Sequence, residues 1–203
     1  MNLKDTYNKI AKDWHKDHQS DDWWVEGTDA FISFLKQGDL VLDVGCAGGF
    51  KSKYLINKGL SVLGIDFSEN LIEIAKKEVS GAEFLVMDMR EVNTLHQKFD
   101  GIFAQASLLH LPKKETPEII KKFFANLKSG GYLYVAVKGA RDNISEEEVK
   151  EENDYGYSYE RFFSYYTTDE IKKYFADAGF EIVYENISEV SSTWIQIIGR
   201  KLK

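Results

Sequence analysis

The stretch that decides the fold is LVLDVGCAGGFKSKYLINKG, residues 40–59. It begins with an apolar run typical of a buried strand, and Gly45, Gly48 and Gly49 then open a turn almost without side chains. A helical pattern follows, around residues 49–58. A glycine-rich turn between strand and helix lets a ligand approach the backbone, and the amide groups of the first helical turn are free to bind it. The stretch therefore predicts a ligand site at this turn.

Further apolar runs alternate with helical patterns along the chain. We expect strands at residues 39–44, 60–66, 82–88, 99–106 and 131–138, and helices around 49–58, 68–79, 91–97 and 114–128. Strands joined by crossover helices favour a mainly parallel sheet that is covered on both faces. Two last apolar runs, at 180–189 and 192–201, are close enough in sequence to form an antiparallel hairpin. The predicted class is α/β.

The composition limits the classes of protein. A length of 203 residues favours one compact domain over residues 1–203. A formal net charge of −7 disfavours a protein that holds nucleic acid through many Lys and Arg contacts. Cys46 is the one cysteine, which excludes an intramolecular disulfide framework. The polar first residues and the lack of a long apolar run predict no membrane partner and a cytoplasmic location.

Two carboxylates near the turn indicate what kind of ligand it binds. A dinucleotide fingerprint needs G-x-G-x-x-G, but Ala47 and Phe50 occupy the second and third glycine positions. Asp43, just before the turn, would repel a pyrophosphate and suit an ammonium or a sulfonium. Asp66 ends the second strand, where an acidic side chain can bind both hydroxyls of an adenosine ribose. NAD and S-adenosylmethionine both contain that ribose.

The end of the third predicted strand offers groups for an adenine ring. Asp88 is placed to accept a hydrogen bond from the adenine amino group, and Met89 offers apolar surface to one ring face. Phe67, next to Asp66, is expected to cover the other face.

Five motifs in order, VLDVGCAGG, GIDFSENLIEIAKK, FLVMDMRE, FDGIFAQASLLHLPKKE and LKSGGYLYVAVK, give the chain a family resemblance. It resembles the class I S-adenosylmethionine-dependent methyltransferases, in particular the small bacterial type with LLHLP after the fourth strand. The resemblance implies a Rossmann-like mixed sheet of seven strands, order 3-2-1-4-5-7-6, with strand 7 antiparallel. It also implies S-adenosylmethionine as the cofactor and S-adenosylhomocysteine as its product.

The resemblance also assigns residues to parts of the cofactor. Asp43 is expected near its ammonium group, Asp66 at the ribose, and Asp88 with Met89 at the adenine. Lining the methionine part are expected Gly45, Cys46, Ala47 and Gly49. Gln105 and Ala106 are expected to form the floor near the reactive methyl group. The family commonly has glycine at the position of Ala47, and a left-handed alanine would cost about 1 kcal/mol or more.

An N-terminal helical lid is expected over residues 1–37. Tyr7 and Trp14 lie seven residues apart, which places them on one face of a helix. The resemblance implies that this helix folds over the cofactor, with Tyr7 near the methionine carboxylate. The alternative is that both aromatic residues belong to an ordinary apolar helix face.

A substrate-side insertion is expected over residues 139–166. Arg161 is a candidate for recognising an anionic group, Tyr157 and Tyr165 for contacting the substrate, and Lys138 for anchoring a substrate carboxylate. The alternative is an aromatic strand packed on the core with Arg161 at the surface. Within this segment we expect residues 145–154, SEEEVKEEND, to form a solvated helix face.

Histidines are the remaining chemical candidates. His110 follows the fourth strand, and its ordinary pKa near neutrality makes it the candidate general base, with a packing or capping role as the alternative. His15 and His18 lie among carboxylates, but no third well-spaced ligand is evident, so we expect no metal site.

The predicted function is methyl transfer from S-adenosylmethionine to a small-molecule acceptor. AQASLLHLP takes the place of an Asn- or Asp-Pro-Pro-aromatic motif, which disfavours methylation of nucleic-acid amino groups. Two alternatives stay open: a non-catalytic module that binds or senses the cofactor, and an NAD-dependent oxidoreductase.

Overall fold

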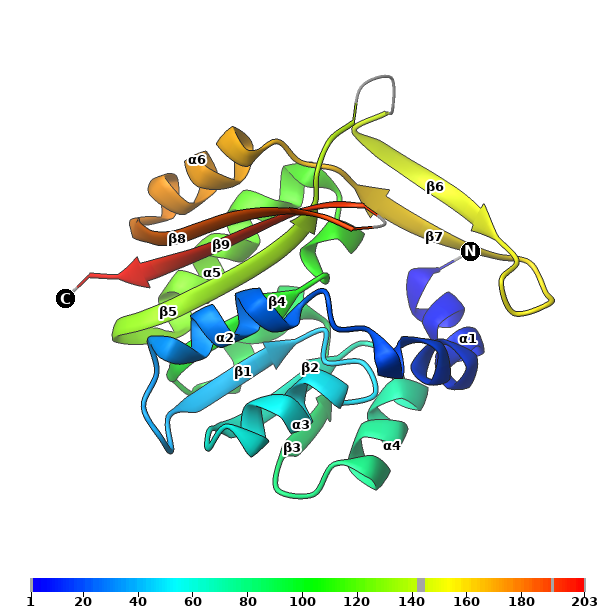
Figure 1. The fold of residues 1–203 in the computed structure, drawn as a ribbon, viewed down its shortest axis with the longest axis horizontal. Helices are drawn as coiled ribbons and strands as arrows, with labels where there is room; N and C mark the ends of the chain where they lie inside the picture. The colour runs from blue at the N-terminus through cyan, green and yellow to red at the C-terminus, as the bar shows by residue number, and fades with distance from the viewer. Residues whose placement is uncertain (1, 142–144, 191, 203) are drawn as a thin grey trace.

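The computed structural model describes residues 2–141, 145–190 and 192–202, and its centre is a seven-stranded sheet (Figure 1). The strand order is β3-β2-β1-β4-β5-β9-β8. Their bounds are β1 Leu40–Val44, β2 Ser61–Asp66, β3 Glu83–Val86, β4 Phe99–Gln105, β5 Leu127–Lys138, β8 Phe180–Glu189 and β9 Thr193–Lys201. The strands from β3 to β5 run parallel, and β9 is antiparallel to both β5 and β8. The predicted order is confirmed apart from the numbering, because two further strands lie outside the sheet.

Helices cover both faces of the sheet, as predicted. The helices are α1 Leu3–Asp17, α2 Val25–Ser33, α3 Phe50–Asn57, α4 Glu69–Glu78, α5 Thr116–Asn126 and α6 Thr168–Ala178. Short 3₁₀ turns are η1 His18–Ser20, η2 Met89–Leu95, η3 Leu108–His110 and η4 Lys113–Glu115. Alternate residues of a strand face opposite sides. Thus Leu42 belongs to the cluster that includes Phe123 of α5 and Phe175 of α6, whereas Val41 packs with Phe31 of α2 and Leu55 of α3.

The two strands outside the sheet form a hairpin, β6 Glu147–Glu152 with β7 Tyr159–Ser164. The prediction of a solvated helix face for residues 145–154 is therefore wrong. An opposite-charge pair joins the two strands, because the Arg161 guanidinium of β7 donates to the Glu152 carboxylate of β6 at 2.8 Å. The run of charges is compatible with a strand because β6 has both faces largely in solvent, with Val149 exposed.

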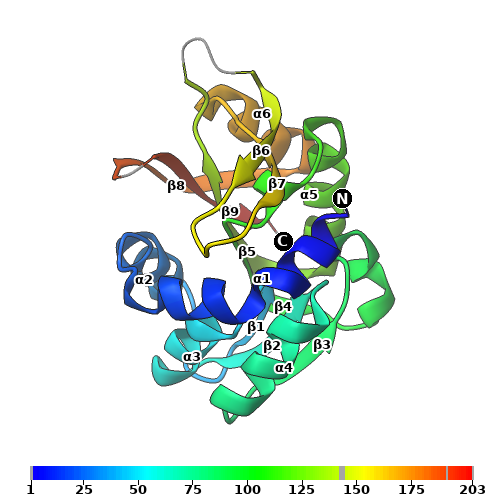
Figure 2. The ribbon, with the colours of Figure 1, turned by 90° about the vertical axis from the view of Figure 1, so that its right-hand side faces the viewer.

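Helix α1 crosses the carboxyl edge of the sheet between α4 and the β6–β7 hairpin (Figure 2). Asn8 Nδ2 donates to Glu69 Oε2 of α4 at 2.8 Å, and Lys9 Nζ donates to the Ser158 carbonyl at 2.8 Å. Of the expected lid and insertion, residue 1 and residues 142–144 lie outside the described part of the chain. The roles of residues 1–37 as a lid and of 139–166 as a substrate-side insertion stay predictions.

In the part of the chain that the structure describes, every helix is too short or too polar to cross a bilayer. The cytoplasmic location stays a prediction.

Candidate functional site

The glycine-rich turn joins β1 to α3 at the carboxyl edge of the sheet. Gly45 and Gly49 have left-handed φ angles of +73° and +81°, and a Cβ at position 45 would lie only 2.6 Å from the Cβ of Ser107. Ala47 also adopts a left-handed φ, +48°. The cost of about 1 kcal/mol or more for a left-handed alanine therefore applies to it. Ala106, at the end of β4, has φ +55°. Strained residues of this kind cluster at ligand sites, and Ala47 and Ala106 both line one cavity.

The Asp66 carboxylate fastens the turn to the end of β2. Its Oδ2 accepts from the Ala47 amide at 3.0 Å, and its Oδ1 accepts from the Ser68 amide at 2.9 Å. Burial raises the pKa of Asp66 to about 6, opposed by these two amides. Each oxygen keeps a further lone pair, so the carboxylate can still accept two hydroxyl donors. It lines the cavity where a ribose was predicted.

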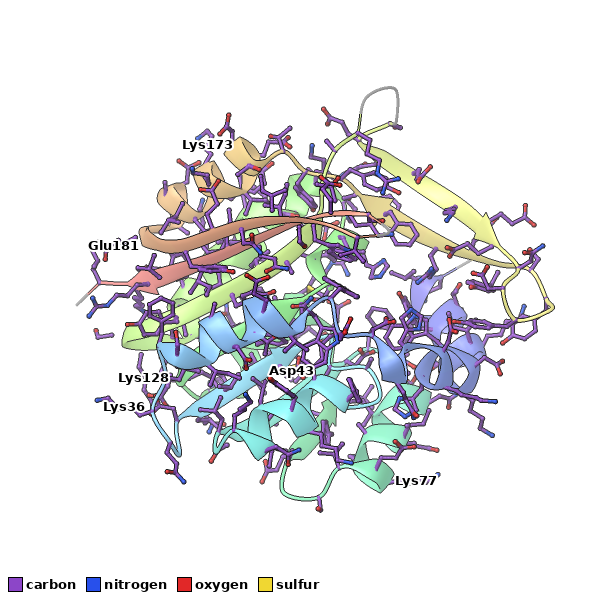
Figure 3. The ribbon with its side chains drawn as sticks, in the orientation of Figure 1. Lys36, Asp43, Lys77, Lys128, Lys173 and Glu181 are labelled. Atoms are coloured by element: carbon purple, nitrogen blue, oxygen red, sulfur yellow. The ribbon has the colours of Figure 1, made fainter. Side chains whose placement is uncertain are left out.

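Asp43 is buried in β1, near the middle of the view in Figure 3, and it lines neither of the two cavities described below. Its Oδ2 accepts from Ser52 Oγ at 2.6 Å, and burial raises its pKa to about 6. Gly49 likewise faces protein, since a Cβ there would meet the Val79 side chain at 2.9 Å. The roles predicted for these two residues at the cofactor stay predictions, and the geometry gives both a place in holding the turn.

A cavity of about 70 Å³, here called the turn cavity, opens under the glycine-rich turn. The structure brings together there ten predicted residues: Tyr7, Trp14, Gly45, Ala47, Asp66, Phe67, Met89, Gln105, Ala106 and His110. Four predicted cofactor residues do not line it, namely Asp43, Cys46, Gly49 and Asp88. The sequence reasoning missed Lys51, Ile65, Leu71, Met87 and Ser107. For two of these residues, position in the sequence could have indicated a place at the site: Lys51 lies in the first turn of α3, and Ser107 follows the end of β4.

Asp88 lies in a groove of about 440 Å³ that adjoins the turn cavity, and the two share Phe67, Met87, Met89 and His110. The Asp88 carboxylate accepts from the backbone amide and the guanidinium of Arg90, at 2.8 and 2.9 Å. A ligand as large as a nucleoside exceeds the turn cavity, so it must use the groove as well. The adenine contact of Asp88 stays a prediction.

Three side chains at the turn cavity have buried polar atoms that lack hydrogen-bond partners among the described residues. They are Gln105, at both amide atoms, Ser107 at its hydroxyl, and Trp14 at its indole nitrogen. A buried polar group without a partner costs about 1–3 kcal/mol, so such groups are normally paired. Three of them around one cavity indicate a polar ligand that supplies the missing partners.

A second cavity, here called the aromatic cavity, has a volume of about 230 Å³ and adjoins the first. Both are lined by Tyr7, Trp14, Ala47, Lys51, Ala106 and His110. Of the predicted substrate residues, Lys138 and Arg161 line it, as does Cys46. Tyr157 and Tyr165 do not, because their hydroxyls donate to Asp13 and Glu148, at 2.7 and 2.5 Å.

Tyr7 and His110 meet where the two cavities join. His110 Nδ1 lies 2.8 Å from the Phe162 carbonyl, which can only accept, so Nδ1 carries the proton and Nε2 accepts from the Tyr7 hydroxyl at 2.7 Å. Burial lowers the pKa of His110 to about 3, and the positive charges of Arg161 and Lys138 add to that shift. The imidazole is therefore neutral at pH 7, with both nitrogens already hydrogen-bonded.

Gly48 marks the contact between the turn and helix α1. A Cβ at this position would lie 2.1 Å from Nδ1 of His15, whose Nε2 bonds Glu78 Oε2 of α4 at 2.9 Å. We expect Gly48→Ala to lower the free energy of unfolding by about 1–3 kcal/mol, because the ring must move. Urea unfolding checks this. In a His15→Ala background, where the ring is absent, we expect Gly48→Ala to cost much less than it does in the wild type. Equal losses with and without the ring would contradict the predicted clash.

Comparison with known proteins identifies the domain. Residues 41–131 match the family model described as a methyltransferase domain. Phosphoethanolamine N-methyltransferase 1 of Zea mays is 36% identical over 119 residues, which is 55% of this chain and 23% of that protein. A ubiquinone biosynthesis O-methyltransferase of Coxiella burnetii is 35% identical over 102 residues, 48% of this chain and 43% of that protein. The chain thus spans less than half the length of these relatives.

Solved structures resemble the chain over almost its whole length. A SAM-dependent methyltransferase of Methanosarcina mazei is 26% identical with a TM-score of 0.74, covering 85% of this chain and 97% of that one. A 1,6-didemethyltoxoflavin-N1-methyltransferase of Burkholderia thailandensis is 16% identical with a TM-score of 0.77, covering 99% and 88%. The latter likeness concerns the fold alone. The sheet order, the match of residues 41–131 to a methyltransferase domain and these structural neighbours make the chain similar to the class I S-adenosylmethionine-dependent methyltransferases.

Proposed function

We propose that the protein transfers a methyl group from S-adenosylmethionine to a small-molecule acceptor and releases S-adenosylhomocysteine. One observation carries the proposal: the unpartnered Gln105, Ser107 and Trp14 groups surround the same cavity as the Asp66 carboxylate. The names of the relatives point the same way. They refer to phosphoethanolamine, ubiquinone biosynthesis and 1,6-didemethyltoxoflavin, and the Burkholderia structure contains 1,6-didemethyltoxoflavin together with S-adenosylhomocysteine.

The residues around the turn cavity fit the parts of this cofactor. Asp66 has two free acceptor positions for the ribose hydroxyls, and Phe67, Met87 and Met89 offer apolar surface to the adenine. Lys51 offers an ammonium to the methionine carboxylate. When bound, the cofactor supplies an electrophilic methyl group on a sulfonium.

The chain itself contributes orientation and the exclusion of water. Tyr7 and Trp14 of α1 line the cavity, and Tyr7 is fixed by its bond to His110. Holding two reacting groups in place can contribute roughly 7 kcal/mol or more to a transfer reaction. For His110 a positioning role on Tyr7 is better supported than the role of a base, because a group with a pKa of about 3 is a weak base at neutral pH.

The two alternatives are less well supported. A non-catalytic binding module needs no second cavity beside the cofactor, yet the aromatic cavity adjoins the turn cavity at Tyr7, Ala106 and His110. An NAD-dependent oxidoreductase would place a pyrophosphate at the turn, where the buried Asp43 carboxylate disfavours it.

Calorimetric titration with S-adenosylmethionine, S-adenosylhomocysteine and NAD tests the proposal. We expect micromolar binding of the first two ligands and no heat with NAD. Binding of NAD alone would favour the oxidoreductase, and failure of all three to bind would overturn the proposed function.

A further inference from the structure

The aromatic cavity is where an acceptor would have to lie if the proposed function holds. It meets the turn cavity at Tyr7, Ala106 and His110, so a ligand in it reaches the end of the cofactor site. Its side chains therefore carry information on the chemical class of the acceptor, which the donor-side motifs do not contain.

The wall of this cavity suits a flat ring. The rings of Trp23 and Trp194 are stacked, with centroids 4.0 Å apart and an interplanar angle of 19°. Phe163 and Leu109 pack with these rings and continue the apolar surface, and Trp24 also lines the cavity. Aromatic surfaces bind aromatic ligands by stacking and edge contacts. At about 230 Å³ the cavity has room for a ring with a substituent, since a cavity of about 150 Å³ holds benzene.

The charged groups of the cavity favour an anion. Lys138 Nζ lies 4.2 Å from the centroid of the Phe163 ring, and it makes no hydrogen bond or ion pair with any described residue. Arg161 lies 5.1 Å from the same ring and is held by Glu152. Among the described residues that line the cavity, Asp21 is the one carboxylate. A half-buried cation without a carboxylate partner is unfavourable. A ligand with an anionic group can supply the counter-ion that Lys138 lacks.

Lys138 and the ring wall lie next to each other by strand register. In the antiparallel pair of β5 and β9, Lys138 lies opposite Trp194, and Trp23 stacks on that tryptophan. Burial, together with Arg161, lowers the pKa of Lys138 to about 8, which leaves most of the amine charged at pH 7. The cation and the stacked rings therefore present one composite surface.

We propose that the acceptor is a planar aromatic carboxylate, whose ring lies against the Trp23–Trp194 stack and whose carboxylate pairs with Lys138. Because this inference names the substrate class of the proposed methyltransferase, it rests on the proposed function, but the binding it predicts is measurable without turnover.

The four tryptophans of the chain, Trp14, Trp23, Trp24 and Trp194, all line the aromatic cavity, so intrinsic fluorescence reports directly on its occupancy. The titration uses full-length protein saturated with S-adenosylhomocysteine and four probes: benzoate, benzamide, cyclohexanecarboxylate and phenyl phosphate. We expect benzoate to bind tighter than benzamide and cyclohexanecarboxylate by roughly tenfold or more, because only benzoate has both the ring and the charge. Phenyl phosphate is expected to bind no tighter than benzoate.

Lys138→Met tests the assigned cation, since it removes the charge and keeps most of the chain length. We expect a loss of roughly tenfold or more in benzoate affinity, with the affinity for S-adenosylhomocysteine unchanged. The matched control is Lys150→Met, which removes a nearby charge outside the cavity, at a residue paired with Glu152. We expect the control to bind benzoate as the wild type does.

Two sets of results separate this inference from the function on which it rests. If S-adenosylhomocysteine binds but benzoate binds no better than benzamide or cyclohexanecarboxylate, the proposed acceptor class is wrong. The proposed methyltransferase function is then unaffected. Tighter binding of phenyl phosphate would likewise overturn the carboxylate. If S-adenosylhomocysteine itself fails to bind, the proposed function fails.

Discussion

Asp66→Ala is expected to weaken the binding of S-adenosylhomocysteine by about 100-fold or more. The carboxylate has one free acceptor position on each oxygen, and hydrogen bonds to a charged group contribute about 1.5–3 kcal/mol each. Two such bonds to the ribose account for about 100-fold or more. The variant also releases the Ala47 amide, so the left-handed turn loses one of its hydrogen bonds to β2. Calorimetric titration measures the loss.

Controls separate the ribose contacts from the general effect of removing a charge. Asp66→Asn keeps one carbonyl oxygen, and we expect an affinity between those of the wild type and the alanine variant. Asp177→Ala removes an exposed carboxylate of α6 that pairs with Lys173 and lies far from the cavities, and it should leave the affinity unchanged. Wild-type affinity in Asp66→Ala would show that the carboxylate does not bind the ligand.

Asp66 was predictable from the sequence, whereas much of the site around it was not. A carboxylate at the end of a parallel strand necessarily lies at the ligand-binding edge of such a sheet. Ser107 and Met87 also follow or end strands, but neither residue type indicates a role by itself. The contact between Ser107 and the turn depends on how closely β4 approaches Gly45, which is a tertiary distance and leaves no local pattern.

The β6–β7 hairpin shows why the sequence predicted the strands of the central sheet but not strand β6. Strands of the central sheet are buried on both faces and read as apolar runs such as residues 40–44. Strand β6 has most of its side chains in solvent, so its sequence has no period of two. Its stability depends on pairing across the hairpin, including Glu152 with Arg161, and the partner lies nine residues away. The composition of β6 alone could not indicate that pairing.

Acid conditions are expected to destabilise the protein through His110. The folded state lowers the pKa of this imidazole to about 3, so between pH 6.5 and 3 the unfolded chain binds a proton that the folded chain excludes. The stabilisation is therefore complete above pH 6.5 and is lost as the pH falls. The side chain is partly exposed to the cavity, and we expect a loss on the order of 3 kcal/mol between pH 7 and pH 4.

His110→Asn isolates this contribution, since an asparagine amide can still donate to the Phe162 carbonyl but does not titrate. Urea unfolding at pH 7 and pH 4 should show the variant destabilised at pH 7 and its deficit reduced at pH 4 by the amount given above. The NMR resonance of the His110 Cε1–H is assigned by its absence from the spectrum of the variant. In the wild type this resonance should not shift between pH 5 and pH 8. A titration near neutrality would contradict the neutral imidazole and restore the case for a general base.

Asp43→Asn supplies a control of opposite sign. Burial raises the pKa of Asp43 to about 6, so the folded state keeps a proton that the unfolded chain releases near pH 4. Its contribution is present at low pH and is lost as the pH rises through 6, the reverse of His110. We expect Asp43→Asn, relative to the wild type, to be more stable at pH 7 than at pH 4. Parallel trends in the two variants would mean that neither buried group controls the pH dependence of folding.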